Sequence, residues 1–430
     1  MALPFSDVPA FRRDPLTLFS ARGMQAEAGL APLHLAPSRI FLVADAALAR
    51  STLKWNTNEI DKGQLVKKLR PIVGDSLLTN VGTDHKRSKD AIHRHLQRNA
   101  VASNLEKMQA ILNGYVSRVM QQGHYDTDEN AALALQLGCT AIFGHDVLQI
   151  ADRQALIEAV RVVEAELAAD MFRILPTMPW RTKSREARLA HARNVVDLVV
   201  RRARKHENCS GLLLALEEAG LSDEAISAEI VGLLIAGHHT TGASITWLHY
   251  HMAADPAIAE LIGAEADLVL EDLENGDAGA LRRAPLSLAF VKEILRLYPA
   301  GWWTSREVKT EVTLGEHELR SGDTLVVSPW VLHRDEKVWV EADELNLDRD
   351  YTNPAYMPFG VGGRSCIGMA IAWFELQLIT LQFASAFRLR TDPSVQAPKP
   401  HPSVTLLAPS MRLGADLRAD EAFSFERLAA

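Results

Sequence analysis

Cysteine is scarce in this chain of 430 residues, which contains only Cys139, Cys209 and Cys366. Three thiols spaced so widely exclude a disulfide-stapled fold and do not match the ligand spacing of a structural zinc site. A reducing compartment suits such a sequence, and we therefore expect the protein to be cytoplasmic.

The chain also lacks an apolar leader, because charged residues are spread through positions 1–22. We expect no signal peptide and no membrane anchor. One uncharged stretch, residues 230–254, is long enough to cross a bilayer. It contains His238, His239 and further histidine, serine and threonine residues, so a buried helix of a soluble protein is the better interpretation.

Positive charge is not in excess, since the net charge is −8, and bulk electrostatics do not favour nucleic-acid binding. No Walker motif, dinucleotide-binding glycine pattern, flavin motif or iron–sulfur motif occurs in the chain. Internal repeats and low-complexity linkers are missing as well. The hydrophobic content of 47% is sufficient for a large core.

Helical patterns dominate between residues 101 and 297, and short strand patterns lie outside that region. The sequence predicts a mainly α fold with a minor β part, in a single domain covering residues 1–430. The predicted portions are β-rich at about 30–50, 305–330 and 388–430, and helical at about 51–300 and 367–387.

A helix of unusual length is predicted from Ser222, a favourable N-cap, to a stop before Pro256. At ~1.5 Å per residue it would extend ~48 Å, enough to cross a domain. Midway lies the sequence Ala-Gly-His-His-Thr-Thr, residues 236–241, where glycine costs helix stability and threonine can bond back to a carbonyl. Residues that disfavour a helix in the middle of a predicted helix indicate a functional stretch, or else a polar helix face that contacts trapped water.

The most informative segment is Phe-Gly-Val-Gly-Gly-Arg-Ser-Cys-Ile-Gly, residues 359–368, followed by an apolar, helix-compatible run. This turn places the Cys366 thiol at a helix N-terminus, where a thiolate is favoured. Its glycines allow the backbone to approach something large and flat. A sulfur ligand to haem iron is the leading interpretation; a small buried cysteine and a phosphate cradle are the alternatives.

Glu293 and Arg296 are spaced to share one helix face and to form an ion pair. Such pairs usually lie on a solvated surface, where they contribute little. Arg349 is a candidate for completing a buried cluster with them.

Taken together, these segments resemble the cytochrome P-450 family of haem-thiolate monooxygenases, in the expected order from about residue 33 to 387. The resemblance implies the cytochrome P-450 fold. In that fold, a long distal helix crosses the domain, and haem b (iron protoporphyrin IX) is buried between it and the cysteine-loop helix. Cys366 would be the iron ligand, and Glu293, Arg296 and Arg349 would form the family's Glu-Arg-Arg triad.

The resemblance also implies other cofactor contacts. Four cations would meet the haem propionates through charge-assisted bonds, unless they are ordinary surface charges: His85, Lys89, Arg306 and Arg364. Ala236, Gly237 and Phe359 would lie against the cofactor. Lys89 stands where arginine is commoner, which exchanges a two-point contact for a point charge.

On the distal side, the resemblance implies that Thr240 hydrogen-bonds dioxygen at the iron and helps to deliver protons. His239 departs from the family pattern, because an acid usually stands there. We hypothesise that His239 alters proton delivery and makes the coupling of electrons to product pH-dependent. Alternatively, His239 only lines the pocket and Thr240 works with water.

The implied reaction inserts one oxygen atom of dioxygen into a small hydrophobic substrate. Electrons would come from a ferredoxin or flavodoxin with its reductase. A cluster of basic residues is the candidate docking surface, or else a solvated face: Lys86, Arg87, Lys89, Arg94 and Arg98. Trp302, Trp303 and Thr304 are candidates for the substrate pocket, although both tryptophans suit a core equally well.

Two other functions remain open from the sequence. The protein could be a haem-thiolate enzyme that uses peroxide or catalyses a rearrangement, or a haem-binding protein without catalysis.

Overall fold

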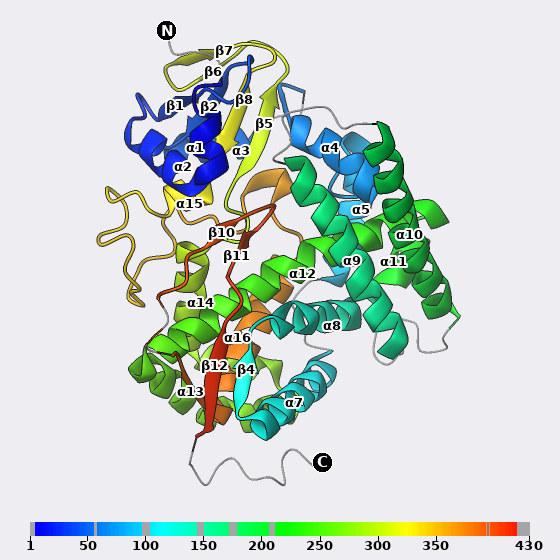
Figure 1. The fold of residues 1–430 in the computed structure, drawn as a ribbon, viewed down its shortest axis with the longest axis vertical. Helices are drawn as coiled ribbons and strands as arrows, with labels where there is room; N and C mark the ends of the chain where they lie inside the picture. Colours follow the sequence, from blue (N-terminus) through cyan, green and yellow to red (C-terminus); the bar gives the residue numbers. More distant parts are fainter. Residues whose placement is uncertain are drawn as a thin grey trace.

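The computed structural model describes residues 5–55, 58–96, 104–143, 150–171, 179–205, 211–392, 394 and 396–418. The fold is mainly helical with small sheets, as predicted. A β-rich part, which carries the first helices, lies at the top of Figure 1, and the larger helical part lies below it.

The main sheet has five strands in the order β1-β2-β8-β5-β3. Their bounds are Leu30–Leu33, Ile40–Val43, Thr324–Val327, Thr304–Val308 and Ile60–Asp61. Strands β2 and β8 pair in parallel, with Leu42 opposite Val326, and the other pairs are antiparallel. Four short helices accompany the sheet: α1 (Val8–Arg13), α2 (Pro15–Met24), α3 (Ala46–Lys54) and α15 (Pro329–Leu332).

The remaining strands form small antiparallel units. Strands β6 (Val312–Leu314) and β7 (His317–Leu319) form an antiparallel hairpin. Strand β12 (Arg412–Leu417) pairs with β4 (His124–Asp126) and β9 (Phe387–Arg390). A two-stranded unit joins β10 (His401–Pro402) to β11 (Leu406–Leu407).

Helices make up the larger part. In chain order they are α4 (Gln64–Val73), α5 (Gly82–His95), α7 (Leu105–Gln122), α8 (Glu129–Phe143), α9 (Ile150–Met171), α10 (Pro179–Arg204), α11 (Leu212–Glu218), α12 (Asp223–Ala254), α13 (Pro256–Glu274), α14 (Pro285–Leu297) and α16 (Met369–Ala386). Two 3₁₀ turns, η1 (Ala278–Arg283) and η2 (Gly362–Arg364), complete the set.

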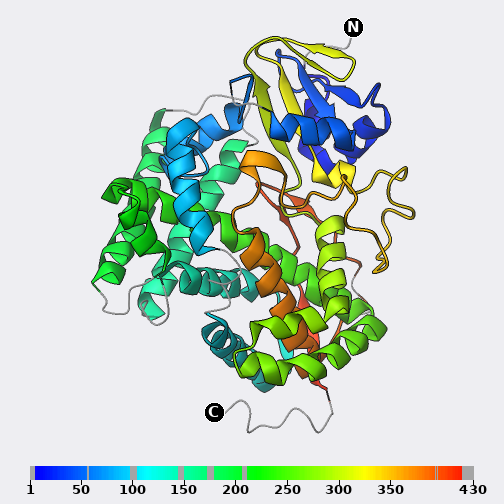
Figure 2. The ribbon, with the colours of Figure 1, turned by 180° about the vertical axis from the view of Figure 1, so that it is seen from behind.

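Helix α12 has the predicted length and ends. The Ser222 hydroxyl accepts a hydrogen bond from the Ala225 N–H at 3.3 Å, and Pro256 begins the next helix. Figure 1 shows α12 crossing the middle of the helical part, and α8 and α16 pack against it. Figure 2 shows α16 from the other side, in front of α12.

Two apolar cores meet along α12. One joins its C-terminal half to α13, α14 and α16, and the other joins its N-terminal half to α9, α10 and α11. Because both cores use this helix, most of its side chains are buried, as predicted for residues 230–254.

Among the described helices, α16 is long and apolar enough to cross a membrane, but 72% of that span is buried inside the protein. The burial is typical of a core helix. Two short strands, β3 and β4, lie in the portion predicted to be helical, and α3 begins in the portion predicted to be β-rich.

Candidate functional site

The loop before α16 holds Cys366 in a fixed turn. The Cys366 N–H donates to the Phe359 carbonyl at 2.8 Å, which closes the loop. Gly360 and Gly362 have φ values of 63° and 81°, a region that favours glycine. A Cβ at Gly362 would lie 2.7 Å from the Leu53 carbonyl oxygen, so this position also needs glycine for space.

The Cys366 thiol lies at the start of α16, as predicted, and it is both accessible and surrounded by protein. Burial raises its pKa, and a hydrogen bond from the Gly368 N–H partly opposes this rise. Because desolvation disfavours the thiolate, a cation is needed to hold sulfur in that form.

The middle of helix α12 also contains an accessible stretch. Ala236 and Gly237 are exposed, although Ile235 and His238 on either side are buried. A Cβ built on Gly237 would meet no atom within 4 Å. The Thr240 hydroxyl donates to the Ala236 carbonyl at 2.6 Å, the backbone contact expected from the sequence.

The four residues predicted to meet the propionates gather around the cysteine loop. Lys89 donates to the Gly363 carbonyl at 2.8 Å. Burial and the charges of Arg364, Lys62 and Lys89 lower the pKa of His85 to about 3, so this imidazole is neutral near pH 7 until a negative partner binds. Burial and the charge of Arg364 likewise lower the pKa of Arg306 to about 10.

Lys62, which the sequence did not single out, belongs to the same cluster. Burial and the charges of Arg364 and Arg306 lower its pKa to about 7. The buried Nη1 atom of Arg364 has no hydrogen-bond partner within the described residues. Cations that lower one another's pKa in this way form a site for a ligand with negative charges.

The predicted triad is assembled. Glu293 accepts from Arg296 and from the Arg349 Nε atom, the latter at 2.9 Å. Arg296 also donates to the His333 and Ala342 carbonyls at 2.8 and 2.6 Å. Helix α14 is thereby bonded to the loop that leads towards Cys366.

The substrate-pocket prediction needs one correction. Trp302 is fully buried, packs against Phe19 at a ring distance of 5.5 Å and donates to the Ser403 carbonyl. It is a core residue of the β-rich part, because its indole N–H finds a backbone partner there. Trp303 and Thr304 are half-buried and stay candidates.

The structure describes only part of the basic cluster that the sequence predicted as a docking surface. Lys86, Arg87 and Arg94 are exposed on α5, while Lys89 turns to the cysteine loop. Arg98 lies outside the described residues.

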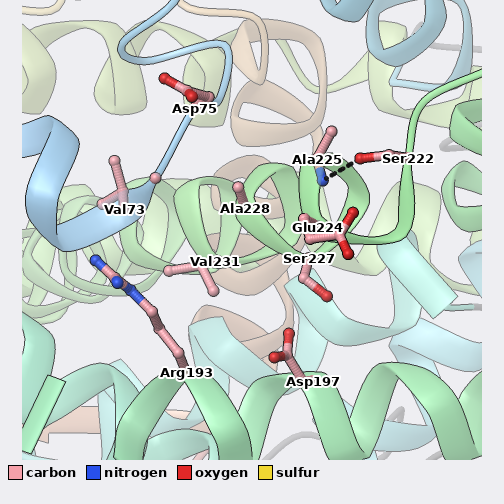
Figure 3. A pocket seen from close by; sticks show the side chains of 11 residues that line it. Val73, Asp75, Arg193, Asp197, Ser222, Glu224, Ala225, Ser227, Ala228 and Val231 are labelled. Carbon is pink, nitrogen blue, oxygen red and sulfur yellow. Dashed lines mark hydrogen bonds between the residues drawn. The ribbon is translucent and has the colours of Figure 1, made fainter. Parts of the chain in front are cut away.

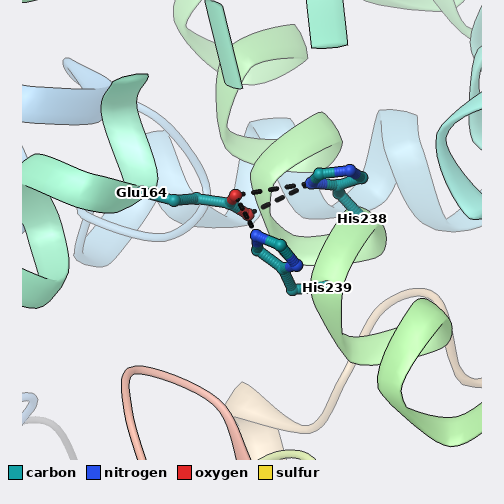
Figure 4. A group of neighbouring side chains, drawn as sticks. All are labelled: Glu164, His238 and His239. Carbon is teal, nitrogen blue, oxygen red and sulfur yellow. Dashed lines mark hydrogen bonds and ion pairs between the residues drawn. The ribbon is translucent and has the colours of Figure 1, made fainter. Parts of the chain in front are cut away.

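Glu164 of α9 is the second residue that sequence reasoning missed. Figure 4 shows its carboxylate between His238 and His239 of α12. Burial alone would raise the pKa of Glu164, but hydrogen bonds from the two histidines hold that pKa below its ordinary value. No local pattern joins these residues, since Glu164 precedes His238 by 74 positions.

A separate surface pocket of about 410 Å³ lies at the N-terminal end of α12. Figure 3 shows its lining from α10 and α12 and the segment after α4, including Arg193, Asp197 and Glu224. Cys366 and the exposed stretch of α12 are not among its lining residues.

The family model described as Cytochrome P450 matches residues 30–414, and the chain belongs to that family. Cyclooctatin synthase of Streptomyces melanosporofaciens is 27% identical, covering 93% of this chain and 91% of that protein. Cyclooctat-9-en-7-ol 5-monooxygenase from the same organism is 26% identical, covering 89% and 87%. Pentalenene oxygenase of Streptomyces avermitilis is 26% identical, covering 89% and 88%.

Two solved structures show the same fold. The haem domain of cytochrome P450DA has a TM-score of 0.80 at 22% identity, covering 94% of this chain and 93% of that one. A six-coordinated cytochrome P450 from Thermus thermophilus has a TM-score of 0.74 at 24% identity, covering 94% and 98%. Family membership makes the protein an oxidoreductase that incorporates oxygen and uses haem iron.

The residues present fit a haem group. An accessible thiol lies at the start of one helix, and an exposed stretch without side-chain bulk interrupts the buried helix packed against it. The mutually repelling cations suit two propionates. The buried Arg364 Nη1 atom, which has no partner within the described residues, can donate to one of them. Cys366 would hold the iron, and the cation cluster would hold the carboxylates.

Proposed function

We propose that the protein is a monooxygenase that inserts one oxygen atom of dioxygen into a small, largely hydrocarbon substrate of terpenoid type. The observation that carries the proposal is the accessible Cys366 thiol at the start of α16, with the open Ala236–Gly237 stretch on the packed helix α12. The bacterial relatives named for cyclooctatin and pentalenene support the substrate class.

The chain's own groups have separable roles in this proposal. Haem b supplies the oxidising chemistry when bound. Cys366 gives a sulfur ligand whose anionic form the Gly368 N–H favours. Thr240 Oγ1 provides a hydroxyl that can hold a proton beside the open stretch, and His239 provides an imidazole next to it. Trp303 and Thr304 are the proposed pocket side chains.

Electrons would come from a separate ferredoxin or flavodoxin with its reductase, in the cytoplasm. The exposed basic residues of α5 support this, because a positive face steers an acidic partner. Replacing Arg94 by Glu should slow electron transfer, most strongly at low salt. An equal rate at every salt concentration would refute docking at this face.

The cofactor assignment is tested first by the optical spectrum of the reduced carbonyl complex. The wild type should show the red-shifted band of thiolate-ligated haem, and Cys366→His should lose it while retaining haem. Cys139→Ser, which changes the buried cysteine of α8, is the matched control and should keep the band. A band that survives Cys366→His would rule out Cys366 as the ligand.

The substrate class is tested by a spin-state titration with terpenoid hydrocarbons, fatty acids and aromatic compounds. Terpenoids should give the largest spectral shift. Turnover is then compared between a ferredoxin–reductase system and peroxide alone. Faster turnover with peroxide alone would favour a peroxide-using enzyme. An absence of any spectral shift across the panel would favour a haem-binding protein without catalysis.

A further inference from the structure

Glu164, His238 and His239 form a compact cluster between α9 and α12 (Figure 4). One ligand atom from each, a carboxylate oxygen and two ring nitrogens, lies within 4.8 Å of the other two. The cluster is buried on one side and accessible on the other: the side chain of His238 is 1% exposed, that of Glu164 13% and that of His239 32%.

Two neighbouring helical residues reach one point here because they use different ring nitrogens. His238 presents Nδ1, the nitrogen nearer to the backbone, which lies 3.4 Å from both carboxylate oxygens of Glu164. His239 presents Nε2, at the far end of its ring, and this atom contacts the same carboxylate. The two rings lie 4.4 Å apart at 40°.

The spacing of one ligand pair suits a metal ion, and the closer His239 Nε2–Glu164 contact would open slightly to admit one. Nitrogen and carboxylate ligands lie about 2.0–2.2 Å from zinc, so two ligand atoms of a tetrahedral site are separated by roughly 3.3 Å. The separation of His238 Nδ1 from the Glu164 oxygens is already of that size. Two imidazoles and one carboxylate are a ligand set of borderline divalent metals.

We propose that Glu164, His238 and His239 bind a divalent transition-metal ion of the zinc class, at a site distinct from Cys366. The three side chains leave a fourth position for water or another small ligand. His239, the most exposed of the three, adjoins the open stretch of α12, so the fourth position lies on that side. The ion would also join α9 to α12.

The test is a zinc titration of the chelator-treated, haem-loaded full chain by calorimetry, with bound metal counted by elemental analysis. The wild type should bind one zinc ion per chain. Glu164→Gln, His238→Ala and His239→Ala should each weaken binding by more than the roughly 10- to 100-fold that loss of an outer-shell partner costs. His191→Ala, which removes an exposed histidine of α10, is the matched control and should bind like the wild type.

Thermal unfolding gives a second readout. Zinc should raise the unfolding temperature of the wild type and of His191→Ala, because a ligand that binds the folded state stabilises it. It should leave that of Glu164→Gln unchanged, and the unfolding transition itself shows that this variant is folded. A wild type without saturable zinc binding, or binding that survives both Glu164→Gln and His239→Ala, overturns the proposal.

The haem assignment and the metal site are tested independently of each other. A protein that keeps the red-shifted carbonyl band but binds no zinc contradicts only the metal site. One that binds zinc and lacks the band contradicts only the haem-thiolate assignment.

Discussion

Glu293 and Arg296 form a two-point ion pair inside helix α14, with both side chains fully buried. Arg296 Nε and Nη2 each donate to a different carboxylate oxygen of Glu293, both at 2.8 Å. Arg349 and the Tyr351 hydroxyl also donate to this carboxylate. Such a buried pair persists because each charge is bonded on several sides.

Breaking the pair should be severe. Arg296→Met leaves the Glu293 carboxylate buried with fewer partners, and we expect a loss of about 3–5 kcal/mol in the free energy of unfolding. Urea denaturation measures this. Arg388→Met removes an exposed partner of Glu260 and should cost at most about 1 kcal/mol. Equal losses in the two variants would contradict the structural role of the buried pair.

A pH effect on stability follows from His249. This residue is buried against Phe383, and burial lowers its pKa from 6.5 to about 3. Below about pH 6.5, His249 therefore binds a proton in the unfolded chain but stays neutral in the folded protein. Stability is complete above pH 6.5 and falls progressively as the pH drops from 6.5 towards 3.

His249→Phe should remove this part of the pH dependence. Between pH 7.5 and 5.5, the wild type should lose about 1.4 kcal/mol more of its unfolding free energy than the variant. His249 Nδ1 lies 2.8 Å from the Tyr125 hydroxyl. That hydroxyl keeps its bond to Asn130 in the variant, so it is not left as an unpaired buried donor. Denaturation curves at the two pH values give the comparison, and identical pH dependence would disprove the assignment.

The cation cluster should hold the haem propionates. Lys62 Nζ donates to the Leu77 carbonyl at 3.2 Å, and we expect it to meet a propionate as well. Loss of that charge-assisted contact in Lys62→Met, worth about 1.5–3 kcal/mol, should make haem dissociate roughly 10- to 100-fold faster. Transfer of haem to an excess of a scavenger protein measures the rate. Lys337→Met alters an exposed lysine and should leave the rate unchanged. Unaltered haem loss in Lys62→Met would remove Lys62 from the cofactor site.

Thr240 should matter through its hydroxyl. Thr240→Ala removes the proton-holding group, and we expect product formation to fall by on the order of 100-fold while nicotinamide oxidation continues. Thr240→Ser should retain most activity. Ser244→Ala removes a similar backbone contact one turn later, a bond of 2.9 Å to the Thr240 carbonyl, and tests for a mere effect on helix shape. An equal loss in Thr240→Ala and Ser244→Ala would favour that structural explanation.

Local signals predicted much of the architecture. The Ser222 cap and the stop at Pro256 set both ends of α12, and the spacing of Glu293 and Arg296 correctly indicated a pair on one helix face. These features depend on residues within a few turns of one another. Trp302 was ambiguous for the opposite reason, because an indole suits a pocket and a core equally until its neighbours are known.

The sequence by itself determined the class of protein, because the Cys366 loop must carry its glycines, its thiol and the start of α16 in consecutive positions. Only the tertiary structure decided which distant side chains share one environment. Packing of separate segments brings Lys62 beside Arg306 and Arg364, and Glu164 beside His238 and His239. The physical reason is that ion pairs and ligand sets depend on distance in space, and packing rather than chain order sets that distance.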